Sequence, residues 1–258
     1  MKVLSKNKIK VLKEILIIIP ARQGSQGIKN KNIRNIHGFP LLAYSIEAAK
    51  KFIEKKKEIY LSTDSKKILY IGRKFFPFSN DIKTRPKKIS QNFSRDIEFI
   101  NHALAHYSKK NFFFKNCLIL IPTNPIRRLS TLNSAYKVFK KNLSCSSLKS
   151  IAISEKSLFK MWIRNKKNII TNLAVKSKKI EIFNEPRQLL PRSYIQTGTI
   201  EFLRLNYKNK IFNFSGKKIY GFLVDSYEAL DIDRLHDLRS VKISKNFIFP
   251  VKCKKKKY

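Results

Sequence analysis

Residues 15–32 read ILIIIPARQGSQGIKNKN, an unbroken apolar run followed directly by a loop of small, polar and basic residues. The apolar run has the length of one strand and is rich in β-branched isoleucine, which is typical of a parallel strand buried on both faces. Pro20 ends the run, and Gly24, Ser25 and Gly27 let the backbone turn tightly and approach a ligand closely. The stretch therefore predicts an α/β fold with a ligand-facing loop after its first core strand.

This loop also carries positive charge, on Arg22, Lys29 and Lys31. Backbone amides and cations at the carboxyl end of a parallel strand are suited to bind a triphosphate. The spacing of Gly24 and Gly27 fits neither the P-loop nor the G-x-G-x-x-G pattern of dinucleotide folds. From the chemistry of the loop alone, a phosphate site and an ordinary strand-to-helix turn are both open interpretations.

The composition favours a globular protein and does not by itself identify a partner. A chain of 258 residues with 43% hydrophobic residues suits one large α/β domain, or one domain with an insertion. The formal charge of +39 is typical of nucleic-acid-binding proteins. However, Lys, Asn, Ile and Phe are abundant together throughout the chain, as an AT-rich genome would supply. We therefore keep nucleic-acid binding only as the less favoured alternative.

Cysteine usage and hydropathy predict a cytoplasmic protein. The cysteines at positions 117, 145 and 253 form no CxxC pair, so neither zinc nor a disulfide framework is expected. The apolar run at 15–19 is too short for a signal peptide, and no stretch reaches the roughly 20 apolar residues of a membrane span. We expect basic tails at 1–13 and 252–258.

The rest of the chain alternates between strand and helix patterns, which predicts a doubly wound sheet. From residue 151 to about 190 the alternation lapses, and residues 160–173 have the pattern of a hairpin. We therefore expect a single domain over 1–258 with an insertion at about 151–190. Helices are predicted at 40–55, 65–74, 96–107 and 130–141, and further strands at 58–61, 117–121 and 219–224.

Acidic residues follow two of these strands. Asp64 comes directly after a strand, where it faces the ligand edge of the sheet or, as the favoured interpretation, caps the next helix. Asp231 and Asp233 lie two apart, so in extended geometry both carboxylates point the same way and can hold a hard divalent cation. The alternative is that Asp233 caps a helix beginning at Arg234.

Five short stretches carry a resemblance to a known family. Pro-Ala-Arg-Gln-Gly-Ser at 20–25 is followed by Lys-Asn at 31–32 and Gly-Phe-Pro-Leu at 38–41, then by Ser-Thr-Asp at 62–64 and Asp-Ile-Asp at 231–233. Together these stretches closely resemble the CMP-sialic acid synthetases, or acylneuraminate cytidylyltransferases, which activate nine-carbon keto acids with CTP. The resemblance extends over most of the chain, from about residue 14 to residue 240.

The resemblance implies a Rossmann-like, doubly wound mixed sheet of the nucleotide-sugar transferase type. It also implies a reaction that transfers CMP from CTP to the anomeric hydroxyl of an N-acylneuraminate or related nonulosonic acid. Pyrophosphate is the second product of that reaction. The resemblance further implies Mg²⁺ as the cofactor, bound by Asp231 and Asp233. These two aspartates, Arg22 and Lys31 are the residues expected to carry the catalysis. The residues expected to contact the nucleotide are Arg22, Gly24, Ser25, Lys31, Asn32 and Arg85.

The same resemblance implies a homodimer. In the family, the region corresponding to 151–190 is an arm that packs on the partner subunit and lends it substrate-binding residues. Lys160 matches a family lysine, and Arg187-Gln188 matches the family's Arg-Gln, so these cations are expected to pair with a substrate carboxylate. Thr197-Gly198 stands where many relatives have Asn-Gly, and completes the expected substrate-binding set.

Three departures from the family leave the acceptor sugar open. Ile121 replaces a glutamine that contacts the sugar in relatives, Thr197 replaces asparagine, and Glu201 replaces tyrosine. We therefore keep legionaminic acid, pseudaminic acid and an eight-carbon keto acid as alternatives, and an inactive relative that only binds as a further one. Glu201 is predicted to be an outward-facing strand residue rather than a catalytic one. The sequence identifies no general base.

Overall fold

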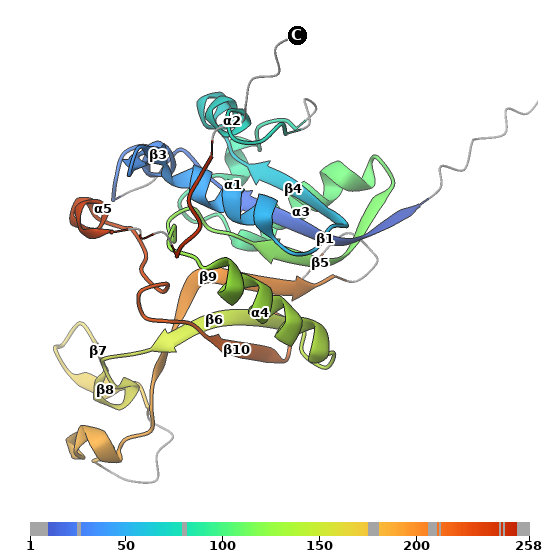
Figure 1. Cartoon of the computed structure of the whole chain (residues 1–258). Coiled ribbons are helices and arrows are strands. Elements are labelled where there is room, and N and C mark those ends of the chain that lie inside the picture. The colour runs from blue at the N-terminus through green and yellow to red at the C-terminus, as the bar shows by residue number, and fades with distance from the viewer. Residues whose placement is uncertain are drawn as a thin grey trace, which may run out of the picture.

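The computed structural model describes residues 10–24, 27–78, 82–174, 181–205, 211, 213–242, 244 and 246–251. Within them, a six-stranded sheet has the order β10-β6-β9-β5-β1-β4 (Figure 1). Strand β9 is antiparallel to both of its neighbours, while the other paired strands run parallel. The predicted mixed, doubly wound sheet is thereby confirmed. Its strands are β1 (Val11–Pro20), β4 (Lys57–Ser62), β5 (Phe112–Ile119), β6 (Ser147–Ile153), β9 (Tyr194–Arg204) and β10 (Ile219–Leu223).

Strand β1 lies inside the sheet, as its isoleucine run predicts. It pairs in parallel with β4 on one side and with β5 on the other. Each residue from Ile15 to Ile19 is completely shielded from solvent. Fully burying an aliphatic side chain of this size contributes about 1.5–3 kcal/mol, so this strand is a major source of the core's stability.

Helices cover both faces of the sheet (Figure 1). On one face, Phe202 of β9 makes a tilted contact with Phe52 at the end of α1 and a stacked contact with Phe139 of α4. On the other face, α3 packs its Tyr107 against Tyr60 of β4. The helices are α1 (Leu41–Lys51), α2 (Lys66–Arg73), α3 (Asp96–Ser108), α4 (Leu129–Lys141) and α5 (Leu235–Ser240).

The carboxyl ends of the parallel strands bring distant loops together. Strands β1, β4 and β5 end at the same edge of the sheet, so the loops that begin at residues 21, 63 and 120 are neighbours. The segment after β10 reaches the same edge, where the backbone amide of Ile232 donates to the carbonyl of Thr123 at 2.9 Å. A ligand-binding site is therefore expected at this edge of the sheet.

A small arm projects from the body below β6 (Figure 1). Its strands β7 (Trp162–Arg164) and β8 (Ile170–Asn172) form a separate antiparallel pair, which confirms the predicted hairpin. Two single-turn helices at Ile182–Asn184 and Arg187–Leu189 complete the part of the arm that the structure describes. A second short pair, β2 (Asn35–Ile36) and β3 (Phe39–Pro40), leads into α1.

Candidate functional site

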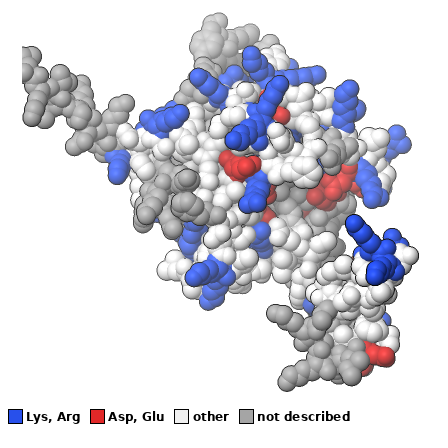
Figure 2. Space-filling view, turned by 180° about the vertical axis from the view of Figure 1, so that it is seen from behind, with Lys and Arg blue, Asp and Glu red and all other residues white. Residues whose placement is uncertain are grey.

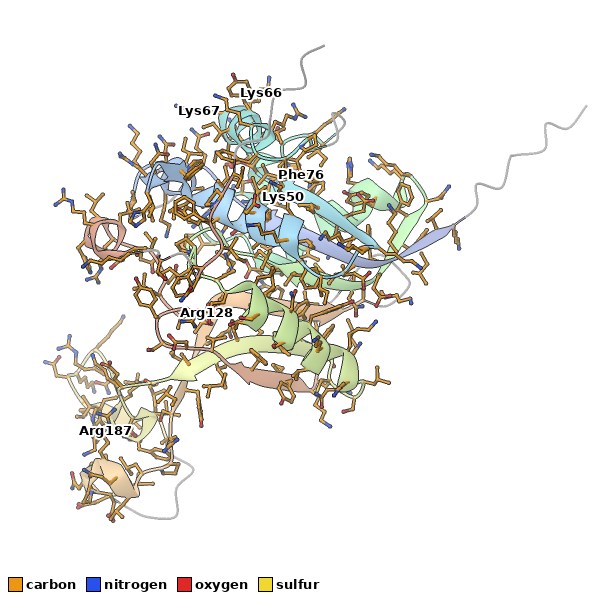
Figure 3. All side chains as sticks on the ribbon, in the orientation of Figure 1. Lys50, Lys66, Lys67, Phe76, Arg128 and Arg187 are labelled. Carbon is orange, nitrogen blue, oxygen red and sulfur yellow. The ribbon has the colours of Figure 1, made fainter. Side chains whose placement is uncertain are left out.

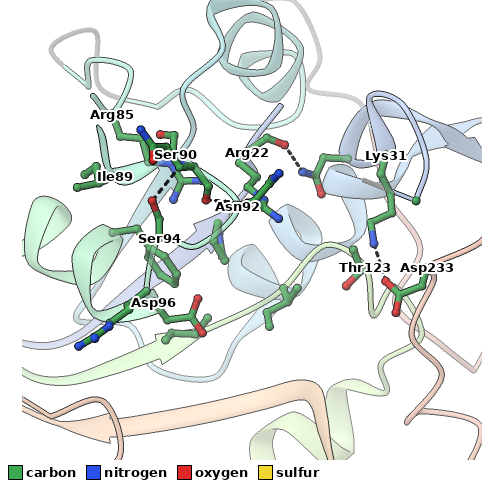
Figure 4. A pocket seen from close by; sticks show the side chains of 18 of the residues that line it. Arg22, Lys31, Arg85, Ile89, Ser90, Asn92, Ser94, Asp96, Thr123 and Asp233 are labelled. Atoms are coloured by element: carbon green, nitrogen blue, oxygen red, sulfur yellow. Dashed lines mark hydrogen bonds and ion pairs between the residues drawn. The ribbon is translucent and has the colours of Figure 1, made fainter. Parts of the chain in front are cut away.

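A cavity of about 620 Å³ opens at the carboxyl edge of the sheet. Its walls come from the loop after β1, from the segment that leads into α3, from the end of β5 and from the segment after β10. Figure 4 shows Lys31, Thr123 and Asp233 on one side, with Arg85, Ser94 and Asp96 on the other. The residues predicted to bind nucleotide or metal that line this cavity are Arg22, Lys31, Asn32, Arg85 and Asp233.

The loop after β1 is held in shape by its own side chains. Asn32 is buried, and its Nδ2 donates to the carbonyl of Arg22 at 2.8 Å. The guanidinium of Arg22 in turn donates to the carbonyl of Gln91 at 2.8 Å. These contacts place one cation on the cavity wall and close the loop on itself. Gly24 belongs to this loop without lining the cavity, and Ser25 lies outside the described residues.

Asp64 supports the same loop and does not cap α2. Its Oδ1 accepts a hydrogen bond from the backbone amide of Gln23 at 2.8 Å. The residue before α2 is Ser65, whose hydroxyl accepts from the amide of Ile68 at 3.4 Å. The predicted cap by Asp64 is therefore wrong, because the serine one residue later is better placed for that contact.

Arg85 is the most deeply buried cation on the cavity wall, at 6% exposed. Its backbone amide donates to the carbonyl of Thr63 at 2.7 Å, and its guanidinium lies 5.8 Å from the ring centre of Phe99. Burial lowers the pKa of Arg85, and Asp64 and Asp96 oppose that effect. Its buried Nε has no hydrogen-bond partner within the described part of the chain. A buried donor of this kind is costly unless a ligand accepts from it.

Lys31 and Asp233 form an ion pair across the cavity mouth, with Nζ and Oδ1 2.8 Å apart. The two chain segments also touch through their backbones. A Cβ atom at Gly27 would lie 2.4 Å from the carbonyl oxygen of Asp233, so only glycine allows this approach. The loop after β1 and the segment after β10 thus form one unit.

The structure does not support Asp233 as a helix cap. The carboxylate of Asp237 accepts from the backbone amides of Asp233 and Arg234, at 2.9 and 2.7 Å, and so closes the first turn of α5 itself. The Asp233 side chain is directed to Lys31 instead. The capping interpretation is wrong because the residue inside the turn performs that task.

The geometry around Asp231 and Asp233 fits a hard cation. Ile232 between them is completely buried while both carboxylates are exposed, as expected for alternating side chains. Only Asp233 lines the cavity. Among the described residues, no group of three or more His, Cys, Asp or Glu side chains could hold a metal ion. Two carboxylates, completed by water and phosphate oxygens, match the way Mg²⁺ is usually bound.

Arg127 is a structural residue that the sequence did not reveal. It is 1% exposed, and its three nitrogens donate to the carbonyls of Thr199 and Ile121, each at 2.7 Å, and to the hydroxyl of Ser45 at 3.1 Å. Burial lowers the pKa of Arg127 to about 9, although nearby Glu228 opposes that shift. This arginine joins the turn after β5 to β9 and α1, and so fixes one wall of the cavity.

Two predicted substrate contacts lie within the sheet rather than on the cavity wall. The hydroxyl of Thr197 donates to Oγ of Ser150 at 2.7 Å, inside the β6–β9 pairing. A Cβ atom at Gly198 would lie 2.4 Å from Oδ1 of Asn124, so glycine lets β9 approach the turn after β5. Neither residue lines the cavity.

The remaining predicted substrate contacts belong to the arm. Arg187 and Gln188 line a second cavity, of about 480 Å³, at the base of the arm. Figure 3 shows Arg187 on the arm, well separated from Arg128 at the start of α4. Lys160 lies in the single-turn helix Leu158–Lys160 before β7. One chain therefore does not bring Lys160, Arg187 or Gln188 to the cavity at the carboxyl edge of the sheet.

Glu201 is not the outward-facing residue that the sequence predicted. It is only 3% exposed, because β9 lies between β5 and β6 and α3 covers that face of the sheet. The sequence could not predict its position beneath the cavity, because the alternation of a strand does not show which face of the sheet other elements cover.

On the face shown in Figure 2, positive charge is spread rather than gathered into one patch. Figure 2 shows lysine and arginine side chains in separate groups across the visible face, with acidic side chains between them. Within the described residues, no helix is long and apolar enough to cross a bilayer.

Comparison with known proteins supports the resemblance. Residues 16–113 match the family described as cytidylyltransferase. Over this segment the resemblance seen in the sequence is confirmed. The matched segment contains residues 16–20 of β1, the loop after them, Arg85 and the whole of α3, which together form much of the cavity wall. The match agrees with the sequence-based assignment to the nucleotidyltransferases.

Among three curated relatives, two have names that state CMP transfer to a nonulosonic acid, and one is named for flagellin modification. An N-acylneuraminate cytidylyltransferase of Escherichia coli is 34% identical over 49% of this chain and 28% of its own length. The post-translational flagellin modification protein B of Campylobacter coli is 27% identical over 90% of this chain and 94% of its own. A CMP-N,N'-diacetyllegionaminic acid synthase of Legionella pneumophila is 30% identical over 58% and 62%. The match thus spans less than two thirds of the first and third relatives.

Solved structures agree on the fold. CMP:2-keto-3-deoxy-manno-octonic acid synthetase in complex with CTP superposes with a TM-score of 0.59 at 14% sequence identity, over 88% of this chain and 95% of that one. A 4-diphosphocytidyl-2C-methyl-D-erythritol synthase from Anaerococcus prevotii gives a TM-score of 0.55 at 12% identity, over the same shares of the two chains. At such identities the likeness concerns the fold alone.

Proposed function

We propose that this chain transfers CMP from CTP to the anomeric hydroxyl of a nonulosonic acid and releases pyrophosphate. The observation that carries the proposal is the cavity at the carboxyl edge of the sheet, which gathers Arg22, Lys31, Arg85 and Asp233 from segments far apart in sequence. Such a group of cations suits a triphosphate. The family match and the names of the relatives supply the reaction class.

For this reaction the protein mainly has to position the two substrates and to neutralise the negative charge of the phosphates. The hydroxyl oxygen of the acceptor attacks the α-phosphorus of CTP and gives up its proton to solvent. The bond from the α-phosphorus to the bridging β-phosphate oxygen breaks, with its electron pair leaving on pyrophosphate. Arg22 and Lys31 lie where they can stabilise the negative charge on the phosphates. The Nε of Arg85, which has no hydrogen-bond partner among the described residues, is suited to donate to an acceptor atom of the nucleotide.

Mg²⁺ is the cofactor that fits the two exposed carboxylates after β10. Asp231 and Asp233 would hold it, and when bound it would offset charge on the phosphate oxygens. The present partner of Asp233, the Lys31 ammonium, is within reach of the same phosphates. Lys31 can therefore exchange a carboxylate for a phosphate oxygen without leaving the cavity.

The acceptor is expected to be an N-acylneuraminate or a related nonulosonic acid. Ile121, which replaces a polar residue of the sialic acid enzymes, lines the cavity together with Ile119 and Phe99. This apolar surface favours an acceptor with fewer hydroxyl groups at the matching position, because an unpaired polar group loses its hydration on burial. Legionaminic and pseudaminic acids, named in several relatives, are therefore kept beside N-acylneuraminate.

The arm supports a homodimer. Its large apolar side chains are exposed in a single chain, among them Ile163 at 58% and Ile170 at 51%. Its cations Lys160 and Arg187 lie away from the nucleotide cavity of their own chain. Packing the arm on a second copy would cover the apolar side chains and bring those cations to the partner's cavity.

One experiment tests the activity directly. Pyrophosphate release is measured with each of the four nucleoside triphosphates against N-acetylneuraminic, legionaminic, pseudaminic and eight-carbon keto acids, in the presence of Mg²⁺. We expect release with CTP and one class of nonulosonic acid. Absence of release in every combination, with CTP still bound, would identify a binding protein that has lost the reaction.

A further inference from the structure

Glu201 lies directly beneath the nucleotide cavity. Its cross-strand neighbours are Ile119 on β5 and Lys149 on β6. Successive residues of a strand face opposite sides, and Phe202 packs on the α4 face, so Glu201 faces α3. Ile119, on the same face, forms part of the cavity wall. The carboxyl of Glu201 is therefore one residue layer below the space proposed for the nucleotide.

The contacts of Glu201 form a small polar network inside the sheet. Nε2 of Gln196 donates to Oε1 of Glu201 at 2.8 Å, and Nζ of Lys149 lies 3.9 Å from the same oxygen. The ammonium also donates to Oε1 of Gln196 at 3.3 Å. The β6–β9 register shifts between the pairs Lys149–Glu201 and Ile151–Gln196, where β9 carries the extra residues and Gln196 reaches back to Glu201. The side chain of Lys149 is only 13% exposed and lies 4.8 Å from the ring centre of Phe214.

Asp96, in the first turn of α3, is the third charged member of this group and lines the cavity. Burial, together with the nearby Asp96, raises the pKa of Glu201 to about 7. Enclosure by the cavity walls also raises the pKa of Asp96. For both carboxyls, Lys149 is the main opposing charge. The Lys149 ammonium is thus the main positive charge near both carboxyls, and ionising Glu201 and Asp96 together costs free energy because their charges repel.

We propose that Glu201 is a positioning residue which controls nucleotide binding by determining whether Lys149 neutralises Glu201 or Asp96. When Glu201 holds a proton, Lys149 balances Asp96 and this part of the cavity wall carries no net charge. When Glu201 has released that proton to solvent, one negative charge remains beside the space for a triphosphate. The inference rests on the proposed function, because it takes the cavity's ligand to be CTP.

The groups that face Glu201 come from every element packed against it. They are Lys149 on β6, the buried thiol of Cys117 on β5, Asp96 on α3 and the amide of Gln196 on β9 itself. Arg22 and Arg85 act on Asp96 from the other cavity walls. The thiol is fully buried and its pKa is raised by burial, so it stays neutral. The charge of the network near neutral pH therefore changes through Glu201.

The expected effect is a fall in affinity for CTP as the pH rises through about 7. A single charge at this depth, screened by the protein and by nearby arginines, should change the dissociation constant about three- to tenfold. Glu201→Gln should abolish this dependence. The substitution keeps the size of the side chain and its contact with Gln196, and it cannot ionise.

The test measures CTP binding by calorimetry without an acceptor sugar, from about pH 6 to about pH 8.5. The ratio of dissociation constants between wild type and Glu201→Gln cancels the ionisation of the nucleotide itself. We expect this ratio to rise with a midpoint near pH 7, whereas the ratio for exposed Glu155→Gln stays constant. Lys149→Met, which removes the ammonium, should move the midpoint to higher pH.

The outcomes separate the inference from the function on which it rests. CTP binding with a constant ratio for Glu201→Gln overturns the inference and leaves the proposed function standing. No CTP binding by any variant, wild type included, overturns the proposed function and the inference with it. A titration of the Glu201 carboxyl by carbon NMR is the direct check: a midpoint near 7 supports the inference, and one near the ordinary 4.5 overturns it.

Discussion

The ammonium of Lys31 lies 2.8 Å from Oδ1 of Asp233, although 202 positions separate them in sequence. The pair joins the first loop of the fold to the last segment before α5. Because the Asp233 side chain is 68% exposed, the pair should add at most about 1 kcal/mol to stability. Its importance is that it places a cation and a carboxylate at the mouth of one cavity, where each can act on a triphosphate.

Replacing Lys31 tests the phosphate loop. Lys31→Ala removes a charge-assisted contact of about 1.5–3 kcal/mol, so kcat/KM for CTP should fall roughly ten- to hundredfold. The melting temperature should change little, because the side chain has no role in the core and its exposed pair with Asp233 adds at most about 1 kcal/mol. Lys29→Ala is the matched control, since Lys29 lies in the same loop, is exposed and does not line the cavity. Equal turnover by Lys31→Ala and wild type would remove the phosphate-site assignment.

Replacing Asp233 tests the cation site. Asp233→Asn removes a negative charge where charge governs affinity for a hard cation, so turnover should fall strongly and recover in part at raised Mg²⁺. Stability should change little, because Asp237 rather than Asp233 closes the first turn of α5. Asp231→Asn should behave alike, and the double variant should lose less than the sum of the single losses. Normal turnover of Asp233→Asn at limiting Mg²⁺ would contradict the metal role.

Much of the fold could be predicted from hydrophobic periodicity. The run at Ile15–Ile19 is apolar enough to identify a strand buried on both faces, and the helices from α1 to α4 lie close to their predicted positions. Strand β6 was not predicted, because its residues Ser147–Ile153 include serines and a lysine whose burial depends on neighbouring strands. A polar residue in the middle of a sheet gives no local signal of that burial.

The part of the candidate site that is formed by residues of short sequence motifs could be predicted. The motif residues Arg22, Lys31 and Asp233 meet at one cavity. The roles of Asp64 and Thr197 could not be read from sequence, because each depends on a partner more than 40 positions away, Gln23 and Ser150 respectively. Sequence rules for helix caps consider only nearby residues. They therefore predicted that Asp64 caps α2, whereas its carboxylate contacts the distant Gln23.

Replacing Arg127 tests its role in holding the cavity wall. Arg127→Met should destabilise the protein by about 2–4 kcal/mol in urea unfolding, because the carbonyls of Thr199 and Ile121 lose their donor while buried. Arg239→Met, at an exposed position of α5, is the control and should lie within about 0.5 kcal/mol of wild type. A near-neutral result for Arg127→Met would show that other groups or water satisfy these carbonyls.

The arm should determine the oligomeric state. Wild type is expected to be a dimer in light scattering, and Ile163→Asp should yield monomer, because a charge then replaces an exposed apolar side chain of the arm. Tyr70→Asp is the control, since Tyr70 is 64% exposed on α2, away from the arm. A wild-type monomer that turns over CTP at full rate would exclude the dimer as a requirement.

Buried Glu201 should make stability depend on pH with an unusual sign. Its pKa rises from 4.5 to about 7 on folding, so between these values the folded protein holds a proton that the unfolded chain has released. Stability from this group is therefore highest below about pH 4.5 and falls as the pH rises to about 7, by roughly 3 kcal/mol in total. Lowered carboxyl pKa values, as at Glu14, act in the opposite direction.

The measurement is the free energy of urea unfolding of wild type and Glu201→Gln at about pH 5 and about pH 8. Subtracting the two proteins cancels the other titrating groups, Glu14 included. The unfolding free energy of the variant, relative to that of wild type, should be about 2–3 kcal/mol higher at the higher pH than at the lower pH. The reason is that glutamine avoids the cost of ionising a buried carboxyl. The same difference at both pH values would mean that Glu201 ionises freely, and that the network with Lys149 and Asp96 does not hold a proton at neutral pH.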